Sequence, residues 1–337
     1  MATSGYRNVT VTSWNTLRFS WTLESQDVAK NTSRVSWKLE LIAGSDGYIS
    51  STAAKAWSVT VNGTKYSGTN TIGIANNATK TLASGATTIA HNADGTKTFS
   101  YSFSQEFGIT FSGTSLGTFS GNSTGTLTTI PRASQPSLIT WPETTNDVGN
   151  FGDTISIHMN RASSSFTHTV RYKFGSSSGT IATGVTTGTT WTIPKSLMNL
   201  IPGALSGSGT IYADTYNGTT LIGTKYCGFT ATVPTTSDCY PSASLTLEDT
   251  TGWDDTYGQP VRGLSKIKVT VKPTLAYSSP ITTYAVTADG GRYTAATATT
   301  GALKTAGDSL VTATIKDKRG RSGSVSYTMK VLTYALP

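Results

Sequence analysis

The chain carries one cluster of side chains suited to binding a sugar, made up of Trp253, Asp254, Asp255 and Tyr257. An aromatic ring can stack on the C–H face of a pyranose, and carboxylates accept hydrogen bonds from sugar hydroxyls. The surrounding segment is polar and rich in turn residues, so we expect Trp253 to be exposed. We take these four as the candidate ligand-binding residues, although an exposed Trp between tandem modules can also be interface packing.

The same acidic stretch has two other interpretations, which use Glu248 and Asp249 together with Asp254 and Asp255. A glycosidase needs two carboxylates about 5–10 Å apart, and a calcium loop needs several oxygen ligands. The stretch matches no spaced ligand motif, and a solvated loop explains it. We therefore expect no metal site and no hydrolytic pair here.

The three histidines, His91, His158 and His168, belong to no catalytic or metal-binding motif, and no nucleophile elbow or P-loop is present. His91 precedes an Asn-Ala-Asp-Gly turn and is expected to be a polar residue flanking it. His158 and His168 fall on neighbouring predicted strands and are expected to pair across them. We predict no catalytic residue, no cofactor and no enzymatic activity.

Two cysteines, Cys227 and Cys239, are too few for a structural zinc site. They form either one disulfide or two separate thiols.

Alternating apolar residues predict β-strands throughout the chain. The rows that begin at Leu17, Val35, Trp57 and Phe99 each place every second side chain on a core face. Asn-Gly and Asp-Gly turns predict hairpins over residues 54–66 and 87–103. A helix of about two turns is expected only over residues 195–201, because Pro194 and Pro202 bound it. Among the tryptophans, core positions are expected for Trp21, Trp37, Trp57 and Trp191, and intermediate ones for Trp14 and Trp141.

Proline-containing segments near residues 131–136 and 234–241 divide the chain into three parts. We predict a jelly-roll-like or Ig-like sandwich over residues 1–132, followed by Ig/FnIII-like sandwiches over 133–235 and 236–337. The predicted fold is thus all-β, with tandem antiparallel β-sandwiches. The 64 Thr and 41 Ser residues fit hydroxyl-rich outer faces of such sheets.

The formal net charge of +8 comes from 26 basic and 18 acidic residues, and the surplus is spread along the chain. The densest basic run is Lys316, Lys318, Arg319 and Arg321, which we interpret as a solvated hairpin tip. Nucleic-acid binders concentrate their charge on one patch, so no nucleic-acid partner is expected. No apolar run approaches the length of about 20 residues that spans a membrane, so no membrane insertion is expected.

The first residues carry no basic segment followed by an apolar stretch, so we expect no secretory signal peptide. The composition nevertheless resembles that of extracellular β proteins. Virion proteins resolve this tension, because they are made in the host cytoplasm and are released by lysis.

Several segments resemble the minor structural, tail-associated proteins of siphophages that infect Gram-positive bacteria. They are WSVTVNG at 57–63, TIAHNADGTKTF at 88–99, TIPRAS at 129–134, DTYNG at 214–218 with IGTK at 222–225, and IKDKRGRS at 315–322. Of these segments, DTYNG, IGTK and IKDKRGRS resemble the C-terminal Ig-like modules of such proteins. The resemblance implies a tail component present in several copies beside other virion tail proteins, with a role in adsorption to the host.

The expected function is therefore a non-catalytic virion tail protein that helps adsorption to cell-wall polysaccharide or teichoic acid. Its positive charge would attract anionic wall polymers weakly and in a salt-dependent way. The alternatives are a purely architectural tail or head-fibre spacer without a ligand and, less favoured, a wall-glycan hydrolase.

Overall fold

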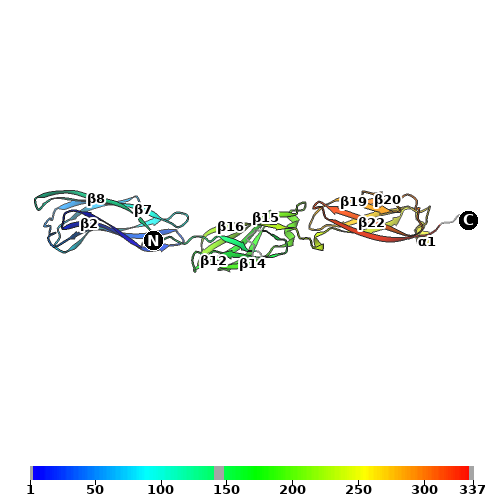
Figure 1. Ribbon diagram of the computed structural model, residues 1–337, viewed down its shortest axis with the longest axis horizontal. Helices are drawn as coiled ribbons and strands as arrows, with labels where there is room; N and C mark the ends of the chain where they lie inside the picture. Colours follow the sequence, from blue (N-terminus) through cyan, green and yellow to red (C-terminus); the bar gives the residue numbers. More distant parts are fainter. Residues whose placement is uncertain (1–2, 140–147, 334–337) are drawn as a thin grey trace. The chain divides into compact units, whose positions relative to one another are not determined.

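The computed structural model describes residues 3–139 and 148–333, and almost all of its regular structure is β-strand (Figure 1). The strands pair mainly antiparallel, and β10 (Val148–Asn150) pairs in parallel with β16 (Thr220–Thr232). The predicted all-β class of tandem antiparallel sandwiches is confirmed.

The first sandwich consists of two four-stranded sheets, coloured blue to cyan-green in Figure 1. One sheet has the order β1 (Ser4–Thr10), β2 (Asn15–Asp27), β3 (Thr32–Ala43), β6 (Thr79–Ala90). The other has the order β5 (Thr64–Thr71), β4 (Ala54–Val61), β7 (Thr98–Phe111), β8 (Thr114–Thr126). The predicted alternating rows supply the core between them, where Phe19 lies stacked on Tyr101 with ring centroids 4.6 Å apart.

Large aromatic rings in this sandwich lie opposite glycines of the adjacent strand. Trp37 is in register with Gly85, and a Cβ atom added to that glycine would lie 2.6 Å from the indole ring. Each ring covers the bare backbone of its glycine partner, so these glycines have a packing role inside strands. The other such pairs are Trp21 with Gly5, Trp57 with Gly68, Phe103 with Gly121 and Phe99 with Gly125.

One predicted hairpin is confirmed and one is wrong. Strands β4 and β5 form the hairpin predicted over residues 54–66, and both Asn62 and Gly63 in its turn have positive φ. Residues 87–103 do not form a hairpin, because β6 pairs with β3 and β7 pairs with β4 and β8. The intervening turn crosses from one sheet to the other. In this turn, a Cβ atom added to Gly95 would lie only 1.9 Å from the Ile130 carbonyl oxygen, so glycine is required there.

Hydroxyl side chains bond to one another across the outer faces of the sheets. Thr98 and Thr126 face each other in register on β7 and β8, with their Oγ1 atoms 3.1 Å apart. Such cross-strand pairs support a sheet without charged residues, which explains how a chain with only 13% charged residues folds. Equivalent pairs join Ser58 to Ser104, Thr154 to Thr192, and Thr314 to Ser324.

The second sandwich (green in Figure 1) packs a three-stranded sheet against a five-stranded one. The first has the order β14 (Gly188–Thr192), β11 (Thr154–Met159), β9 (Pro136–Ile139), and the second has β10, β16, β15 (Ser206–Asn217), β12 (Phe166–Phe174), β13 (Ser177–Val185). The expected short helix is a 3-10 helix, η1 (Lys195–Leu200). A second 3-10 turn, η2 (Ser237–Cys239), follows the sandwich.

The third sandwich (yellow to red in Figure 1) has a three-stranded and a four-stranded sheet, an architecture shared by Ig and fibronectin type III domains. The sheets are β17 (Ser242–Asp249), β18 (Ile267–Thr274), β21 (Thr297–Thr299), and β20 (Gly291–Tyr293), β19 (Ile281–Ala288), β22 (Gly307–Asp317), β23 (Ser322–Val331). The predicted turn between β22 and β23 is present, with the Gly320 amide donating to the Asp317 carbonyl at 3.0 Å.

Three clusters of buried hydrophobic residues form the cores of the three sandwiches. Cα proximity divides the chain into two compact units, of which the first is residues 1–134, 161–168 and 214–225 and the second is residues 135–160, 169–213 and 226–337. The three sequence-based ranges, 1–132, 133–235 and 236–337, therefore stay a prediction.

The prediction that the basic run is a solvated hairpin tip is wrong for two of its four members. Lys316 and Lys318 are exposed, whereas Arg319 and Arg321 are only 6% and 9% exposed. Both guanidinium groups donate to backbone carbonyls of residues that belong, like the arginines, to the second compact unit.

Arg319 donates to the carbonyls of Met198 and Ala276 at 2.8 and 2.9 Å, and more weakly to those of Ile201, Ala204 and Tyr277. Burial lowers the pKa of this guanidinium, which still carries its charge because an arginine side chain stays protonated in proteins. A buried charge is tolerated when it is fully hydrogen-bonded, and the carbonyls supply those bonds here.

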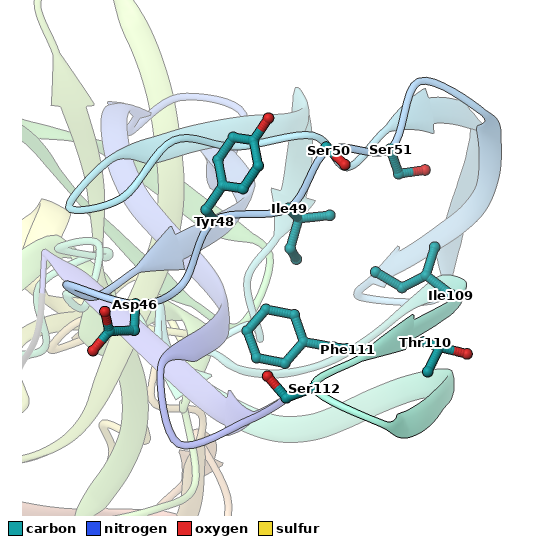
Figure 2. A pocket seen from close by; sticks show the side chains of 9 residues that line it. All are labelled: Asp46, Tyr48, Ile49, Ser50, Ser51, Ile109, Thr110, Phe111 and Ser112. Atoms are coloured by element: carbon teal, nitrogen blue, oxygen red, sulfur yellow. The ribbon is translucent and has the colours of Figure 1, made fainter.

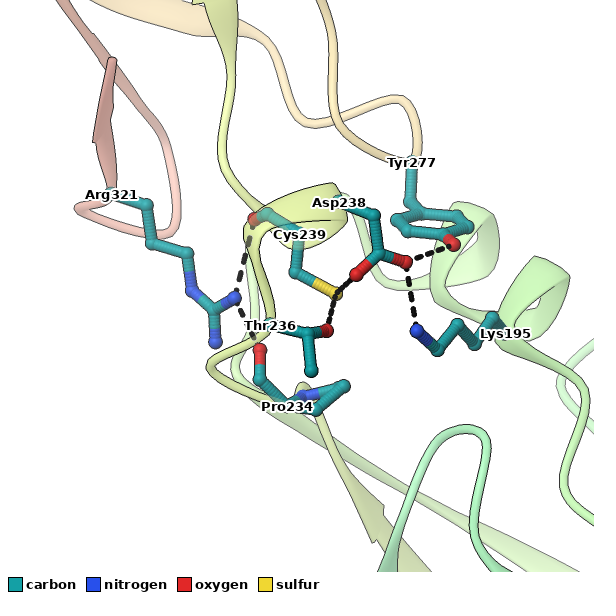
Figure 3. Close-up of polar contacts among 7 residues, drawn as sticks. All are labelled: Lys195, Pro234, Thr236, Asp238, Cys239, Tyr277 and Arg321. Carbon is teal, nitrogen blue, oxygen red and sulfur yellow. Dashed lines mark hydrogen bonds and ion pairs between the residues drawn. The ribbon is translucent and has the colours of Figure 1, made fainter.

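Arg321 binds the segment that joins the second and third sandwiches (Figure 3). Its Nη1 donates to the carbonyls of Pro234 and Cys239 at 2.6 and 3.2 Å, and its Nη2 donates to that of Val233 at 2.8 Å. Beside it, the Asp238 carboxylate lies 2.8 Å from Lys195 Nζ and accepts a hydrogen bond from the Tyr277 hydroxyl at 3.0 Å.

The two cysteines are separate thiols, with Cys239 buried and Cys227 half-buried, so the disulfide alternative is not realised. Within the described residues, no helix has both the length and the apolar character that crossing a membrane takes.

Candidate functional site

Two of the four predicted ligand residues come together on a short helix, α1 (Trp253–Tyr257). Gly252 and Gly258 have positive φ and bound it at either end. Because Trp253 and Tyr257 are four residues apart, their rings lie on one side of the helix and stack with centroids 6.0 Å apart. Tyr257 is 58% exposed, whereas Trp253 is half-buried against the apolar wall beside it, so the expectation that Trp253 is exposed is wrong.

A cavity of about 290 Å³ lies against these two rings. Asp254 and Asp255 do not line it. The remaining wall is mostly apolar, formed by Val261, Leu264, Leu332 and Thr333. The aromatic half of the predicted site is therefore assembled, and its acidic half is not. The ligand-binding role of all four residues stays a prediction.

The neighbouring carboxylates make hydrogen bonds and ion pairs within the third sandwich. The Asp249 carboxylate accepts from Ser265 Oγ at 2.5 Å and from the Thr251 amide at 3.0 Å. Burial raises the pKa of Asp249, but these hydrogen bonds outweigh it and leave the pKa below the usual value. Glu248 pairs with Lys268 on the adjacent strand at 3.0 Å. In the described part of the chain, no three or more His, Cys, Asp or Glu side chains gather as metal ligands would.

The histidine predictions have mixed outcomes. His91 does flank the turn, and it is also buried, with its ring nitrogens 2.7 Å from Ser33 Oγ and from the Gly95 carbonyl oxygen. His158 and His168 do not pair, because β11 and β12 belong to different sheets. His158 lies opposite Gly188, and His168 is buried.

A second candidate site, which the sequence analysis did not single out, lies at one end of the first sandwich. The turn between β1 and β2 projects Trp14, whose side chain is 44% exposed. The turn is held from within, because Thr12 Oγ1 accepts from the Trp14 and Asn15 amides at 3.1 and 3.0 Å. Trp14 is thus an aromatic side chain presented on a fixed turn.

The loop after β3 lies beside this turn and is bonded to it. The Gly44 amide donates to the Trp14 carbonyl at 2.7 Å, and the buried Asn15 side chain donates to the Gly47 carbonyl at 2.7 Å. A Cβ atom on Gly47 would lie 2.8 Å from the Trp14 carbonyl oxygen, so only glycine fits there. The same loop presents Tyr48, which is 60% exposed.

Two adjacent pockets open around these loops and share Phe111 and Ser112 at the end of β7. The larger, about 400 Å³, lies between residues 46–51 and residues 109–112, as Figure 2 shows. The smaller, about 300 Å³, is lined by residues 11–14 and 111–116. We call the two together the tip site, with Trp14, Tyr48 and Phe111 as its aromatic residues.

The tip site was not predictable from local pattern, because its aromatic residues come from two loops and from the end of β7, which are far apart in the sequence. Trp14 was expected to be intermediate in exposure. Its position just before a strand was the one feature of the sequence that could have indicated an exposed ring on a turn. Trp21, Trp37 and Trp191 are buried as predicted, Trp57 is half-buried against the core, and Trp141 lies outside the described residues.

Comparison with known proteins gives distant structural similarities. Fibronectin(III)-like modules of Clostridium thermocellum CbhA are 13% identical, with 58% of this chain and 94% of theirs covered and a TM-score of 0.23. A tetra-tandem repeat from the extending region of a large adhesion protein is 10% identical, with 94% and 82% covered and a TM-score of 0.31. The central fibronectin-III array of RIM-binding protein is 18% identical, with 92% and 95% covered and a TM-score of 0.21.

These values are too low to support an inference about function. No curated protein matches the chain. A family model described as "Siphovirus protein of unknown function (DUF859)" matches residues 16–337. Because that match spans nearly the whole sequence, the chain belongs to this family of siphovirus proteins.

Proposed function

We propose that the chain is a non-catalytic component of the virion tail that contributes to adsorption to glycans of the host cell wall. Membership in a siphovirus family supports a role in the phage particle. The observation that carries the adsorption role is the placing of exposed aromatic rings, Trp14 and Tyr48, beside open hydroxyl-lined pockets. Its partners are other tail proteins and wall polysaccharide.

Weak single sites suffice for this role when the tail carries several copies. A sugar site with a Kd of about 1 mM contributes about 4 kcal/mol. Linking copies on one tail raises the effective concentration and with it the apparent affinity. Adsorption thus requires only shallow binding sites, such as the two pockets of the tip site.

The test is co-sedimentation of the purified chain with isolated cell walls from a panel of Gram-positive species. We expect saturable binding to walls of at least one species, and no release of reducing sugar during the incubation. Failure to bind any wall would contradict the adsorption role. Release of reducing sugar would contradict the non-catalytic one.

A second candidate function is an architectural spacer without a ligand. It is favoured by the burial of Arg319 and Arg321 against carbonyls of the second compact unit, which ties its segments together. Detection of the chain in the tail shaft of purified particles, combined with absent wall binding, would select this alternative.

A further inference from the structure

We propose that the tip site binds an uncharged polysaccharide, with two neighbouring sugar units in its two pockets, rather than an anionic wall polymer such as teichoic acid. This inference rests on the proposed adsorption function and names its ligand class. It narrows the expectation of wall polysaccharide or teichoic acid, and it departs from the expectation, drawn from the net charge, that anionic wall polymers are weakly attracted.

The charges that line the tip site carry the argument. Asp46 is the one charged residue among those that line the two pockets, and it is exposed. A phosphate-rich polymer would meet a carboxylate and no Lys or Arg side chain in that lining, although phosphate recognition relies on those residues. The net charge of +8 on the whole chain is therefore not accompanied by basic side chains in the lining of this site.

The other lining groups match the two surfaces of a neutral sugar. The hydroxyl-bearing residues Ser50, Ser51, Thr110 and Ser112 line the larger pocket, and Ser13, Ser112 and Thr114 line the smaller. They can exchange hydrogen bonds with sugar hydroxyls. The rings of Tyr48, Phe111 and Trp14 offer apolar faces for the C–H surfaces of the sugar.

The size and arrangement of the pockets set the number of sugar units. Each pocket, at about 300–400 Å³, lies at the low end of the range for small-ligand sites. Phe111 and Ser112 line both pockets, so the pockets adjoin and neighbouring units of one chain can occupy both. Because hydrogen bonds hold the Trp14 turn against the Gly44–Gly47 loop, the two halves are positioned before the ligand arrives.

The experiment uses polysaccharide released by a muramidase from the walls that the full chain binds, separated on an anion exchanger into unretained and retained fractions. Titration calorimetry is done with the wild type, with Trp14→Ala/Tyr48→Ala, and with the control Tyr6→Ala, which removes a 67% exposed ring from β1. We expect binding of the unretained, neutral fraction, insensitive to salt from 50 to 500 mM. The double variant should lose at least tenfold in affinity, and the control should match the wild type.

An added charge tests the ligand class directly. Asp46→Lys should raise affinity for the retained, anionic fraction, and that gain should disappear at high salt. Preference of the wild type for the retained fraction, or binding to neither fraction, would overturn the inference.

Failure of this inference is distinguishable from failure of the proposed function. If the wild type and Trp14→Ala/Tyr48→Ala bind whole walls equally well, adsorption stands and the tip site is excluded. Loss of wall binding in Trp253→Ala alone would move adsorption to the cavity beside α1. Circular dichroism on each variant establishes that it is folded.

Discussion

At the scale of single residues, Asp238 shows how an exposed group makes stability depend on pH. Its carboxylate accepts hydrogen bonds from Lys195 and Tyr277 (Figure 3). The Lys195 contact is the largest cause that holds the pKa of Asp238 well below its usual value, and Thr236 and Tyr277 act in the same direction. In the unfolded chain the same carboxyl titrates near its ordinary value of about 3.9.

We predict that Asp238→Asn lowers stability at neutral pH and that the difference from the wild type shrinks as the pH falls below about 4. Because the folded pKa is the lower one, the stabilisation is complete above about pH 4–5 and is lost as the pH falls through the folded pKa. Urea midpoints measured at pH 7, 5, 4 and 3 check this. The exposed Asp308→Asn serves as the control, and a difference that persists unchanged at pH 3 would contradict the prediction.

At the scale of strands, the pairing of aromatic rings with glycines explains why so many glycines lie inside strands. The Trp37 ring occupies the space that a Gly85 side chain would need. Added bulk in a packed core costs about 1–3 kcal/mol. Gly117 on β8 has no atom within 4 Å of an added Cβ and so provides a matched site without a ring.

We predict that Gly85→Val destabilises the first sandwich by about 1–3 kcal/mol, because the new side chain displaces the Trp37 ring. Gly117→Val should change stability much less. Thermal unfolding followed by tryptophan fluorescence measures both. Equal losses of stability in the two variants would show that the packing of the Trp37 ring does not require glycine at position 85.

The strands themselves were predictable because alternation is a local property of the sequence. The rows beginning at Leu17 and Val35 were assigned from their own residues, and both line the core. Pairing was less predictable. The Asp94-Gly95 turn looks like a hairpin turn, but its glycine lies against Ile130, which is 35 positions along the chain and leaves no local signal. This contact also brings together two of the segments that resemble siphophage proteins, 88–99 and 129–134.

The prediction of sites was limited in the same way, because contacts between residues far apart in the sequence leave no local signal. Trp253 and Tyr257 are four residues apart, so a single helical turn brings them together. Trp14, Tyr48 and Phe111 line adjacent pockets only because two loops and the end of β7 converge. Arg319 and Arg321 looked solvated because their acceptors are backbone carbonyls between residues 198 and 277, and any sequence has carbonyls.

At the scale of the molecule, these two arginines couple two hydrophobic cores that would otherwise be separate. The acceptors include Met198 and Val233 of the second core, while the arginines extend from the hairpin of the third. A hydrogen bond to a charged group contributes about 1.5–3 kcal/mol. We therefore expect these bonds to make the two cores unfold together.

We predict that Arg319→Ala/Arg321→Ala splits one calorimetric transition of the wild type into two. The control Lys316→Ala/Lys330→Ala removes the same charge from exposed positions on β22 and β23, the two strands that flank the turn carrying the arginines, and should leave the trace unchanged. Differential scanning calorimetry of the full chain makes the comparison. An unchanged number of transitions in the arginine variant would refute the coupling.

The hydrogen bonds of the two arginines between the second and third sandwiches bear on how tandem β-sandwich proteins diversify in sequence. Arg319 and Arg321 donate their hydrogen bonds to main-chain oxygens, and the Arg321 guanidinium also lies over the Tyr240 ring, 5.0 Å from its centroid. Apart from Tyr240, the side chains of the receiving segments can change without loss of these contacts, provided that the chain keeps its path. A junction held in this way is compatible with replacement of one module by another of different sequence.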